Sequence, residues 1–375
     1  MNGSLKVGKV LGIDLEIHFS WVIIFVFFSY ALSEQYQMIS PERESLWYWI
    51  AGIFTTIIIF LSVFLHELAH SLVAIKEGIS IRRITLFIFG GVAQMEEEPS
   101  SSSSELKISV AGPLTSLGLA IFFGILAFFT NTITEGLPFW VVFFLFYVNL
   151  AMAIFNMIPA FPLDGGRILR ASIWKYSHNL LSSTRVAVSV GTFFAFLAIA
   201  YGFYTILVVG NIWGLWFVFL GWMLYQAGQA SFSQLLFNQA FSGVNISEIM
   251  TTNPYIVPPD MTILEVANKF YQHKVGAFPV VYGSTLHGIV TLNQIKDAPR
   301  EKWETLPVSY IMTPLKNCVT VSPQEEAVKV MTKMAVENLG RVLVVEHGEL
   351  VGIISRTDMM RLLKMNMILG SERVR

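Results

Sequence analysis

The sequence predicts a multi-span α-helical membrane domain of about six transmembrane helices, with a small membrane-associated β-hairpin, followed by a soluble α/β domain. Three observations predict this fold class. The 375-residue chain is 54% hydrophobic and only 14% charged, whereas soluble globular proteins carry about a quarter charged residues. Long apolar segments fill the chain up to about Gly228. From Val244 onward the sequence turns mixed and contains an internal repeat.

The first element is a strand that precedes the first span. Ile13, Leu15 and Ile17 alternate with Asp14 and Glu16, and this period of two predicts a short strand at the membrane interface. The charges of the same segment interrupt any apolar core of a secretory signal peptide.

The spans follow from the length of the apolar segments, because a bilayer needs about 20 apolar residues per helix. The candidates are Ile17 to Ser33, Trp47 to Ile75, Ile108 to Phe129, Phe139 to Ile158, Val186 to Val209 and Ile212 to Gly228. The first and the last are short.

The basic residues orient these spans, because cytoplasmic loops are enriched in Lys and Arg. One side collects Lys6, Lys9, Lys76, Arg82, Arg83, Lys107, Arg167, Arg170, Lys175 and Arg185. The sequence therefore predicts a multi-pass protein of the cell membrane with a cytoplasmic N-terminus and a cytoplasmic C-terminal domain. This topology requires an even number of spans.

The second span contains a possible metal site. His66 and His70 lie one helical turn apart, so both imidazoles can hold one zinc ion, with Glu67 beside them as a general base. Polar groups in lipid are costly unless they share a purpose. The alternative is a buried histidine pair satisfied by backbone or hydroxyl groups, with Glu67 neutral.

A third metal ligand is predicted at the end of the fourth candidate span. Pro159 and Pro162 break the helix there, and Asp164 follows. Asp164 is expected to reach the histidine pair, and the alternative is that it caps the next helix. Asn156 could bind the scissile carbonyl or the substrate backbone, or make an ordinary interhelical hydrogen bond.

Two glycine-containing segments lie between these motifs. Strand formers from Ile81 to Gln94, interrupted by Gly90 and Gly91, predict a β-hairpin. Its edge could pair with an unwound substrate, and the alternative is a purely structural hairpin. Gly112, just before Pro113, is expected to permit close helix packing.

The C-terminal part repeats itself. Ser247 to Thr251 (SEIMT) recurs as Ser309 to Thr313 (SYIMT), and Gly288 to Thr291 (GIVT) recurs as Gly352 to Ser355 (GIIS). Order and content fit a duplicated unit of mixed strands and helices. The net charge of −1 argues against a nucleic-acid partner. The single cysteine, Cys318, excludes an internal disulfide framework.

These residues resemble a known family. The His66-Glu67-Leu68-Ala69-His70 motif, together with the segment from Asn156 to Gly165, resembles the site-2 proteases, and the tail resembles a tandem pair of CBS motifs. The resemblance implies that His66, His70 and Asp164 bind one Zn2+ and that Glu67 is the catalytic acid/base. The implied substrate is a transmembrane segment of another membrane protein.

The resemblance of the tail implies a second ligand. In CBS pairs a Ser/Thr-x-x-Asp motif contacts the ribose of an adenine nucleotide, which here would be ATP, ADP or AMP. The second copy has Ser355 and Asp358, whereas the first has Thr291 and a glutamine, Gln294, in place of the acid. Homodimerisation through the CBS pairs is also implied.

The expected domains are a protease domain (1–230), a linker (231–243), a first CBS motif (244–300) and a second CBS motif (301–368). The predicted function is regulated intramembrane proteolysis, modulated by nucleotide. The alternative is a membrane transporter or channel gated by the CBS pair. Transport would favour internally repeated membrane halves, which the sequence lacks.

Overall fold

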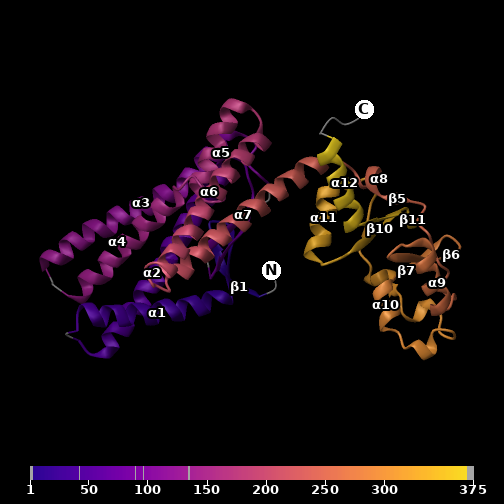
Figure 1. The fold of residues 1–375 in the computed structure, drawn as a ribbon, viewed down its shortest axis with the longest axis horizontal. Helices are drawn as coiled ribbons and strands as arrows, with labels where there is room; N and C mark the ends of the chain where they lie inside the picture. The colour runs from indigo at the N-terminus through magenta and orange to yellow at the C-terminus, as the bar shows by residue number, and fades with distance from the viewer. Residues whose placement is uncertain (1–2, 42, 89, 96, 134–135, 370–375) are drawn as a thin grey trace. The chain divides into compact units, whose positions relative to one another are not determined.

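A computed structural model describes residues 3–41, 43–88, 90–95, 97–133 and 136–369. Contacts divide the chain into two compact units, Met1–Phe232 and Ser233–Arg375. Figure 1 shows the long helices in the first unit and the mixed elements in the second. A helical first unit followed by a mixed α/β second unit agrees with the predicted order of domains.

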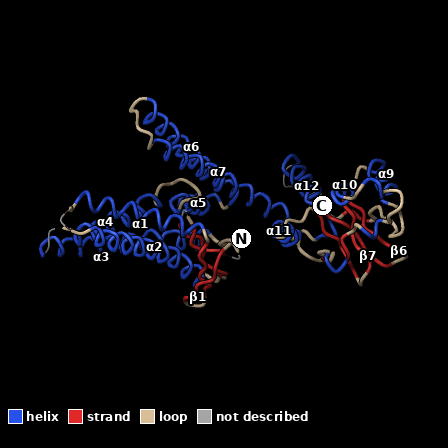
Figure 2. The backbone as a smooth tube through the Cα atoms, turned by 90° about the horizontal axis from the view of Figure 1, so that it is seen from below, coloured by secondary structure: helices blue, strands red, loops and turns tan. Residues whose placement is uncertain are grey.

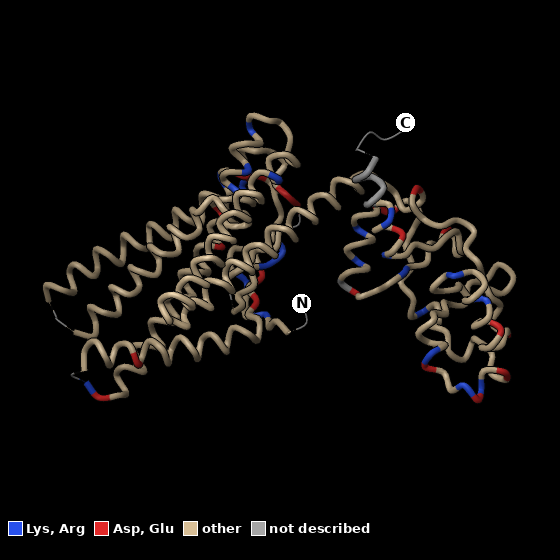
Figure 3. Tube along the Cα trace, viewed as in Figure 1, with Lys and Arg blue, Asp and Glu red and all other residues tan. Residues whose placement is uncertain are grey.

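The first unit consists mostly of long helices. They are α1 (Ser20–Ile39), α2 (Ser45–Lys76), α3 (Ser102–Ile133), α4 (Leu137–Asn156), α5 (Asp164–Ser177), α6 (Leu180–Leu207) and α7 (Gly214–Phe241), of which α7 continues into the second unit. Five of these described helices, α1, α2, α3, α4 and α6, are long and apolar enough to cross a membrane. Figure 3 shows few charged residues along α3 and α4.

The sixth predicted span, 212–228, lies in α7, which is not among the five. Five of the expected spans are therefore found among the described helices, and the sixth stays a prediction because α7 falls short in hydropathy. The physical reason lies in the sequence of α7, because Gln226, Gln229 and Gln234 lower its hydropathy.

A four-stranded sheet accompanies these helices (Figure 2). Its order is β1-β2-β3-β4, with β1 (Ser4–Val10), β2 (Ile13–His18), β3 (Ile81–Phe87) and β4 (Gly90–Met95). The predicted strand and hairpin are confirmed, although Phe89 of the hairpin lies outside the described residues. β1 and the parallel pairing of β2 with β3 were not predicted. The expected small hairpin consists of β3 and β4 and is thus one half of a larger sheet. Strand β4 lies at an edge of that sheet.

The second unit contains two sheets. Their orders are β5-β11-β10-β9 and β6-β7-β8. The strands are β5 (Thr251–Thr252), β6 (Ala277–Tyr282), β7 (Thr285–Thr291), β8 (Thr313–Pro314), β9 (Thr320–Val321), β10 (Arg341–Glu346) and β11 (Glu349–Ser355). The helices are α8 (Ile246–Ile249), α9 (Ile263–His273), α10 (Leu292–Asp297), α11 (Ala327–Val336) and α12 (Arg356–Leu369), with short 3-10 turns at Arg300–Lys302, Val308–Tyr310 and Leu315–Asn317.

The predicted repeat is visible in the strand pairing. Val280 of β6 pairs with Gly288 of β7, and Val344 of β10 pairs with Gly352 of β11. The register shifts directly after each of these pairs. The two copies therefore form the same hairpin with the same irregularity.

Candidate metal centre

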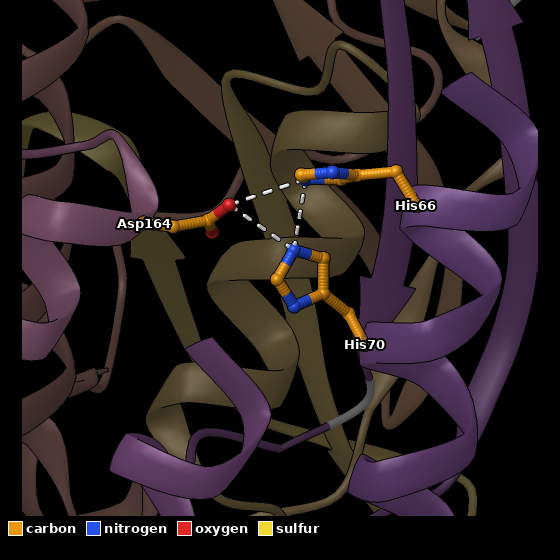
Figure 4. A group of neighbouring side chains, drawn as sticks. All are labelled: His66, His70 and Asp164. Carbon is orange, nitrogen blue, oxygen red and sulfur yellow. Dashed lines mark hydrogen bonds and ion pairs between the residues drawn. The ribbon is translucent and has the colours of Figure 1, made fainter. Parts of the chain in front are cut away.

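Three acceptor atoms from two helices meet inside the first unit. Nε2 of His66 and Nε2 of His70 lie 3.2 Å from each other, and each lies 3.2 Å from Oδ2 of Asp164. All three side chains are buried, and they point toward one another in Figure 4. The structure thus brings together the three residues that the sequence singled out as metal ligands.

Helix α2 supplies both histidines, because residues four apart share one helix face. It packs against α1, α3, α4 and β4. In its apolar window 44% of the residues are buried, against 22–28% in the other four candidate spans. The two imidazoles are therefore enclosed by protein, as polar groups at membrane depth require.

Asp164 reaches the histidines because a proline-containing turn separates α4 from α5. α4 ends at Asn156, and α5 begins at Asp164 itself. Leu163 is the N-cap residue, and it makes no side-chain capping bond. The carboxylate of Asp164 contacts the two imidazoles instead, so the geometry favours the ligand interpretation over the helix cap.

The two glycines after Asp164 allow the turn to lie against the start of α5. A Cβ atom at Gly165 would lie 2.3 Å from the Met157 oxygen, and one at Gly166 would lie 2.2 Å from the Phe161 nitrogen. Neither glycine has a positive φ. They are therefore needed for close approach, not for a left-handed backbone conformation.

Helix α3 orients both rings. Nδ1 of His70 lies 2.6 Å from the Ile108 carbonyl oxygen, and Nδ1 of His66 lies 2.8 Å from Oγ of Ser116. A carbonyl can only accept, so Nδ1 of His70 carries the proton and its Nε2 presents a lone pair. Such partners fix the tautomer of metal-binding histidines. Neither partner, Ile108 or Ser116, was predicted from the sequence, although 108, 112 and 116 share one helix face.

The geometry fits a tetrahedral metal ion. Zinc bonds to nitrogen and oxygen of about 2.0–2.1 Å place tetrahedral ligand atoms about 3.3–3.4 Å apart, close to the 3.2 Å observed. Oδ2 of Asp164 and Nε2 of His70 each direct a lone pair toward this point, and a cation there attracts both. A Cβ at Gly112 would lie 2.2 Å from Nε2 of His70 and 2.5 Å from Nε2 of His66. The absent side chain of Gly112 thus leaves the space that a zinc ion needs.

Glu67 lies beneath the edge strand β4. A Cβ at Gly91 would lie 2.5 Å from Cγ of Glu67, and the backbone of Ala93 hydrogen-bonds to the Glu67 carboxyl group. The carboxyl group of Glu67 is therefore held next to the histidine it follows and next to an unpaired strand edge.

Asn156 has a local partner. Its Nδ2 donates to the carbonyl oxygen of Met152, 3.0 Å away in the same helix. This bond is neither interhelical nor directed at the three converging acceptors.

The second unit has a cavity of about 500 Å³ between the two repeat copies. Its lining includes Thr291, Asn293, Asn317, Cys318, Asn338 and Arg341. Thr291 caps α10 together with Gln294, whose Nε2 also donates to Thr313 Oγ1. Ser355 and Asp358 bond to each other at the start of α12 and do not line this cavity. The cavity therefore lies at the first copy of the motif.

Known proteins match both units. The model of peptidase family M50 matches residues 54–139 and 131–200, and the CBS domain model matches residues 246–301 and 308–365. Zinc metalloprotease MJ0392 of Methanocaldococcus jannaschii is 34% identical over 361 residues, covering 96% of each chain. CBS domain-containing protein YhcV of Bacillus subtilis is 31% identical over 117 residues, which are 31% of this chain and 82% of that protein. The solved structure of a site-2 protease from Methanocaldococcus jannaschii is 30% identical, covers 60% of this chain and 94% of its own, and has a TM-score of 0.42.

Proposed function

The chain belongs to peptidase family M50, the site-2 protease family, and from that premise we propose that it hydrolyses peptide bonds within or near transmembrane segments of other membrane proteins. The observation that carries the proposal is the convergence of His66 and His70, on the apolar helix α2, with Asp164 at the start of α5. Because the chain belongs to a peptidase family, we prefer the protease function to the alternative, a membrane transporter gated by the CBS pair.

In this proposal His66, His70 and Asp164 hold one zinc ion. Bound zinc supplies Lewis acidity that activates a water molecule and polarises the scissile carbonyl. Glu67 takes the proton of the attacking water and passes it to the leaving amine. Its packing against Gly91 and Ala93 supports this role, because the packing holds the carboxyl group beside His66.

Strand β4 is the proposed binding surface for the unwound substrate. A helical substrate hides its carbonyls in its own hydrogen bonds, so it must be extended before hydrolysis. β4 is the last strand of its sheet and covers Glu67. A substrate strand added to that edge would lie beside the proposed general base. Among the described residues, the side chain of Asn156 bonds only to Met152, which leaves one amide N–H and the amide oxygen for the substrate backbone.

The proposed topology places both the N-terminus and the CBS pair in the cytoplasm, where the basic loops lie. Five spans would separate them, so α7 must also cross the membrane. Its 28 residues extend about 42 Å, which is enough to span the hydrocarbon core. A reporter fused after Phe241 should therefore be cytoplasmic, and a periplasmic or extracellular reporter would refute this topology.

We also propose that an adenine nucleotide binds the cavity at the first copy of the CBS motif. Thr291 and Arg341 both line that cavity. The Arg341 guanidinium makes no ion pair within 4.0 Å among the described residues and interacts at longer range with Asp358, so it can bind a phosphate group. ATP, ADP or AMP should therefore protect Cys318, which also lines the cavity, from alkylation, and Arg341→Met should abolish the protection. Unchanged labelling at saturating nucleotide would contradict the proposal.

Co-expression with candidate single-span proteins tests the protease function. Glu67→Gln removes the proton acceptor while leaving the three ligands, so it should retain zinc and lose cleavage. A substrate fragment that appears with the wild type and is missing with Glu67→Gln would support the proposal. A Glu67→Gln variant that cleaves as fast as the wild type would refute the role of Glu67.

A further inference from the structure

A buried ion pair joins α3 to α5. Glu105 is fully buried and Arg170 is 6% exposed. Nε of Arg170 donates to Oε1 of Glu105 at 2.7 Å, and its Nη2 donates to the same oxygen. Arg167 lies 3.9 Å from that oxygen. Oε2 of Glu105 has no hydrogen-bond partner among the described residues.

Such a pair is weak evidence for stability, because burying two charges costs about as much as their attraction returns. Its position suggests another role. Arg170 follows Asp164 by six residues in the same helix, or about 9 Å along the axis. The Arg170 guanidinium also lies 5.0 Å from the ring centroid of Phe161, in the turn that leads into Asp164. Arg170 therefore holds the segments on both sides of Asp164.

One face of α3 contacts both histidine ligands and the helix that carries Asp164. Glu105 holds the helix that carries Asp164, Ile108 bonds to His70, and Ser116 bonds to His66. Gly112 lies on the same face and leaves space at both imidazoles. Residues 105, 108, 112 and 116 follow the i, i+3, i+7, i+11 spacing of a single helical stripe.

We propose that Glu105 and Arg170 are positioning residues, whose buried ion pair fixes α5 against α3 so that Asp164 reaches both histidines. The inference rests on the proposed zinc site and extends it. Without the pair, α5 is free to shift by the few tenths of an ångström that metal ligation does not tolerate. The two histidines, held by α2 and α3, keep their places.

The test measures zinc affinity of the full chain in detergent by competition with a chromogenic chelator. Arg170→Met and Glu105→Gln should each weaken zinc binding at least about tenfold, as the loss of an outer partner does. The matched control is Lys107→Met, which removes an exposed ion pair with Glu77 from the same turn of α3. It should leave zinc affinity unchanged.

A second measurement separates positioning from folding. If Arg170 acts through Asp164, Arg170→Met should cause no further loss of zinc affinity in an Asp164→Ala background. An equal loss in both backgrounds would overturn the proposal, as would wild-type affinity in Arg170→Met. If Arg170→Met fails to accumulate, Arg170→Lys keeps the charge but loses one of the two donors, and it should show a smaller loss.

The melting temperatures of the zinc-free and zinc-loaded protein complete the test. The rise in Tm caused by zinc should shrink in Arg170→Met, whereas a purely structural role would lower both temperatures equally. A wild type that binds no zinc would refute the proposed function itself. A wild type that binds zinc as tightly as Arg170→Met would refute the positioning role alone.

Discussion

Replacing Gly112 by alanine should remove the metal without unfolding the helix. The added Cβ would lie 2.2 Å from Nε2 of His70 and 2.5 Å from Nε2 of His66. Zinc must lie about 2.0–2.1 Å from both atoms, so the methyl group competes for the same space. Alanine for glycine inside a helix normally stabilises it by about 0.5–1 kcal/mol. A loss of metal would therefore not come from loss of helix.

The size of the effect follows from these distances. Cβ contacts under 3.0 Å are essentially never seen, so the His70 nitrogen must retreat from 2.2 Å to at least 3.0 Å. Ligand distances tolerate changes of only about 0.2 Å. We expect zinc affinity to fall at least about 100-fold. The loss of one residue that orients a metal ligand weakens metal binding about 10–100-fold, so the expected effect lies at or beyond the upper end of that range. Cleavage should be lost.

The assay compares zinc per chain after dialysis against a chelator. Gly118→Ala is the matched control, because it lies in the same helix and nothing lies within 4 Å of its added Cβ. It should keep full zinc and full activity. A Gly112→Ala variant with one zinc per chain and normal cleavage would refute this account of the site.

Three further predictions concern groups around the two sites. Ser116→Ala removes the partner of His66 Nδ1 and should weaken zinc binding about 10–100-fold, which chelator competition measures; an unchanged affinity would contradict it. Gly91→Ala displaces the side chain of Glu67, so cleavage should fall at least about tenfold while the zinc content stays normal. A loss of zinc would show that strand β4 acts on the metal ligands and not on Glu67. Burial raises the pKa of the Cys318 thiol, so the reactive thiolate is scarce at neutral pH. Alkylation, measured by mass spectrometry, should therefore accelerate only at a pH above the ordinary pKa of a cysteine thiol; rapid labelling at neutral pH would contradict this.

The parts of the site that depend on local spacing were predictable. His66 and His70 are one turn apart in any helix, and Pro159 and Pro162 disfavour a helix before Asp164, because proline lacks the backbone N–H donor. The strands of the hairpin were predictable from strand formers that flank glycines. In each case the signal lies within a few residues.

The parts that depend on tertiary packing were not predictable. The pairing of β2 with β3 joins Leu15 to Ile84, and nothing in either segment specifies its partner. Ser116 looks like an ordinary serine in an apolar helix until α3 is packed against α2. The cavity that includes Thr291 depends on how the two copies pack together, and nucleotide contacts at Ser355 and Asp358 of the second copy stay a prediction.

The central claim is that His66, His70 and Asp164 bind one zinc ion. X-ray absorption of the purified wild type tests it most directly. We expect one zinc per chain, with two imidazole nitrogens and carboxylate oxygen at about 2.0–2.2 Å, and loss of the oxygen contribution and most of the zinc in Asp164→Ala. A zinc-free wild type, or an unchanged spectrum in Asp164→Ala, would contradict the claim.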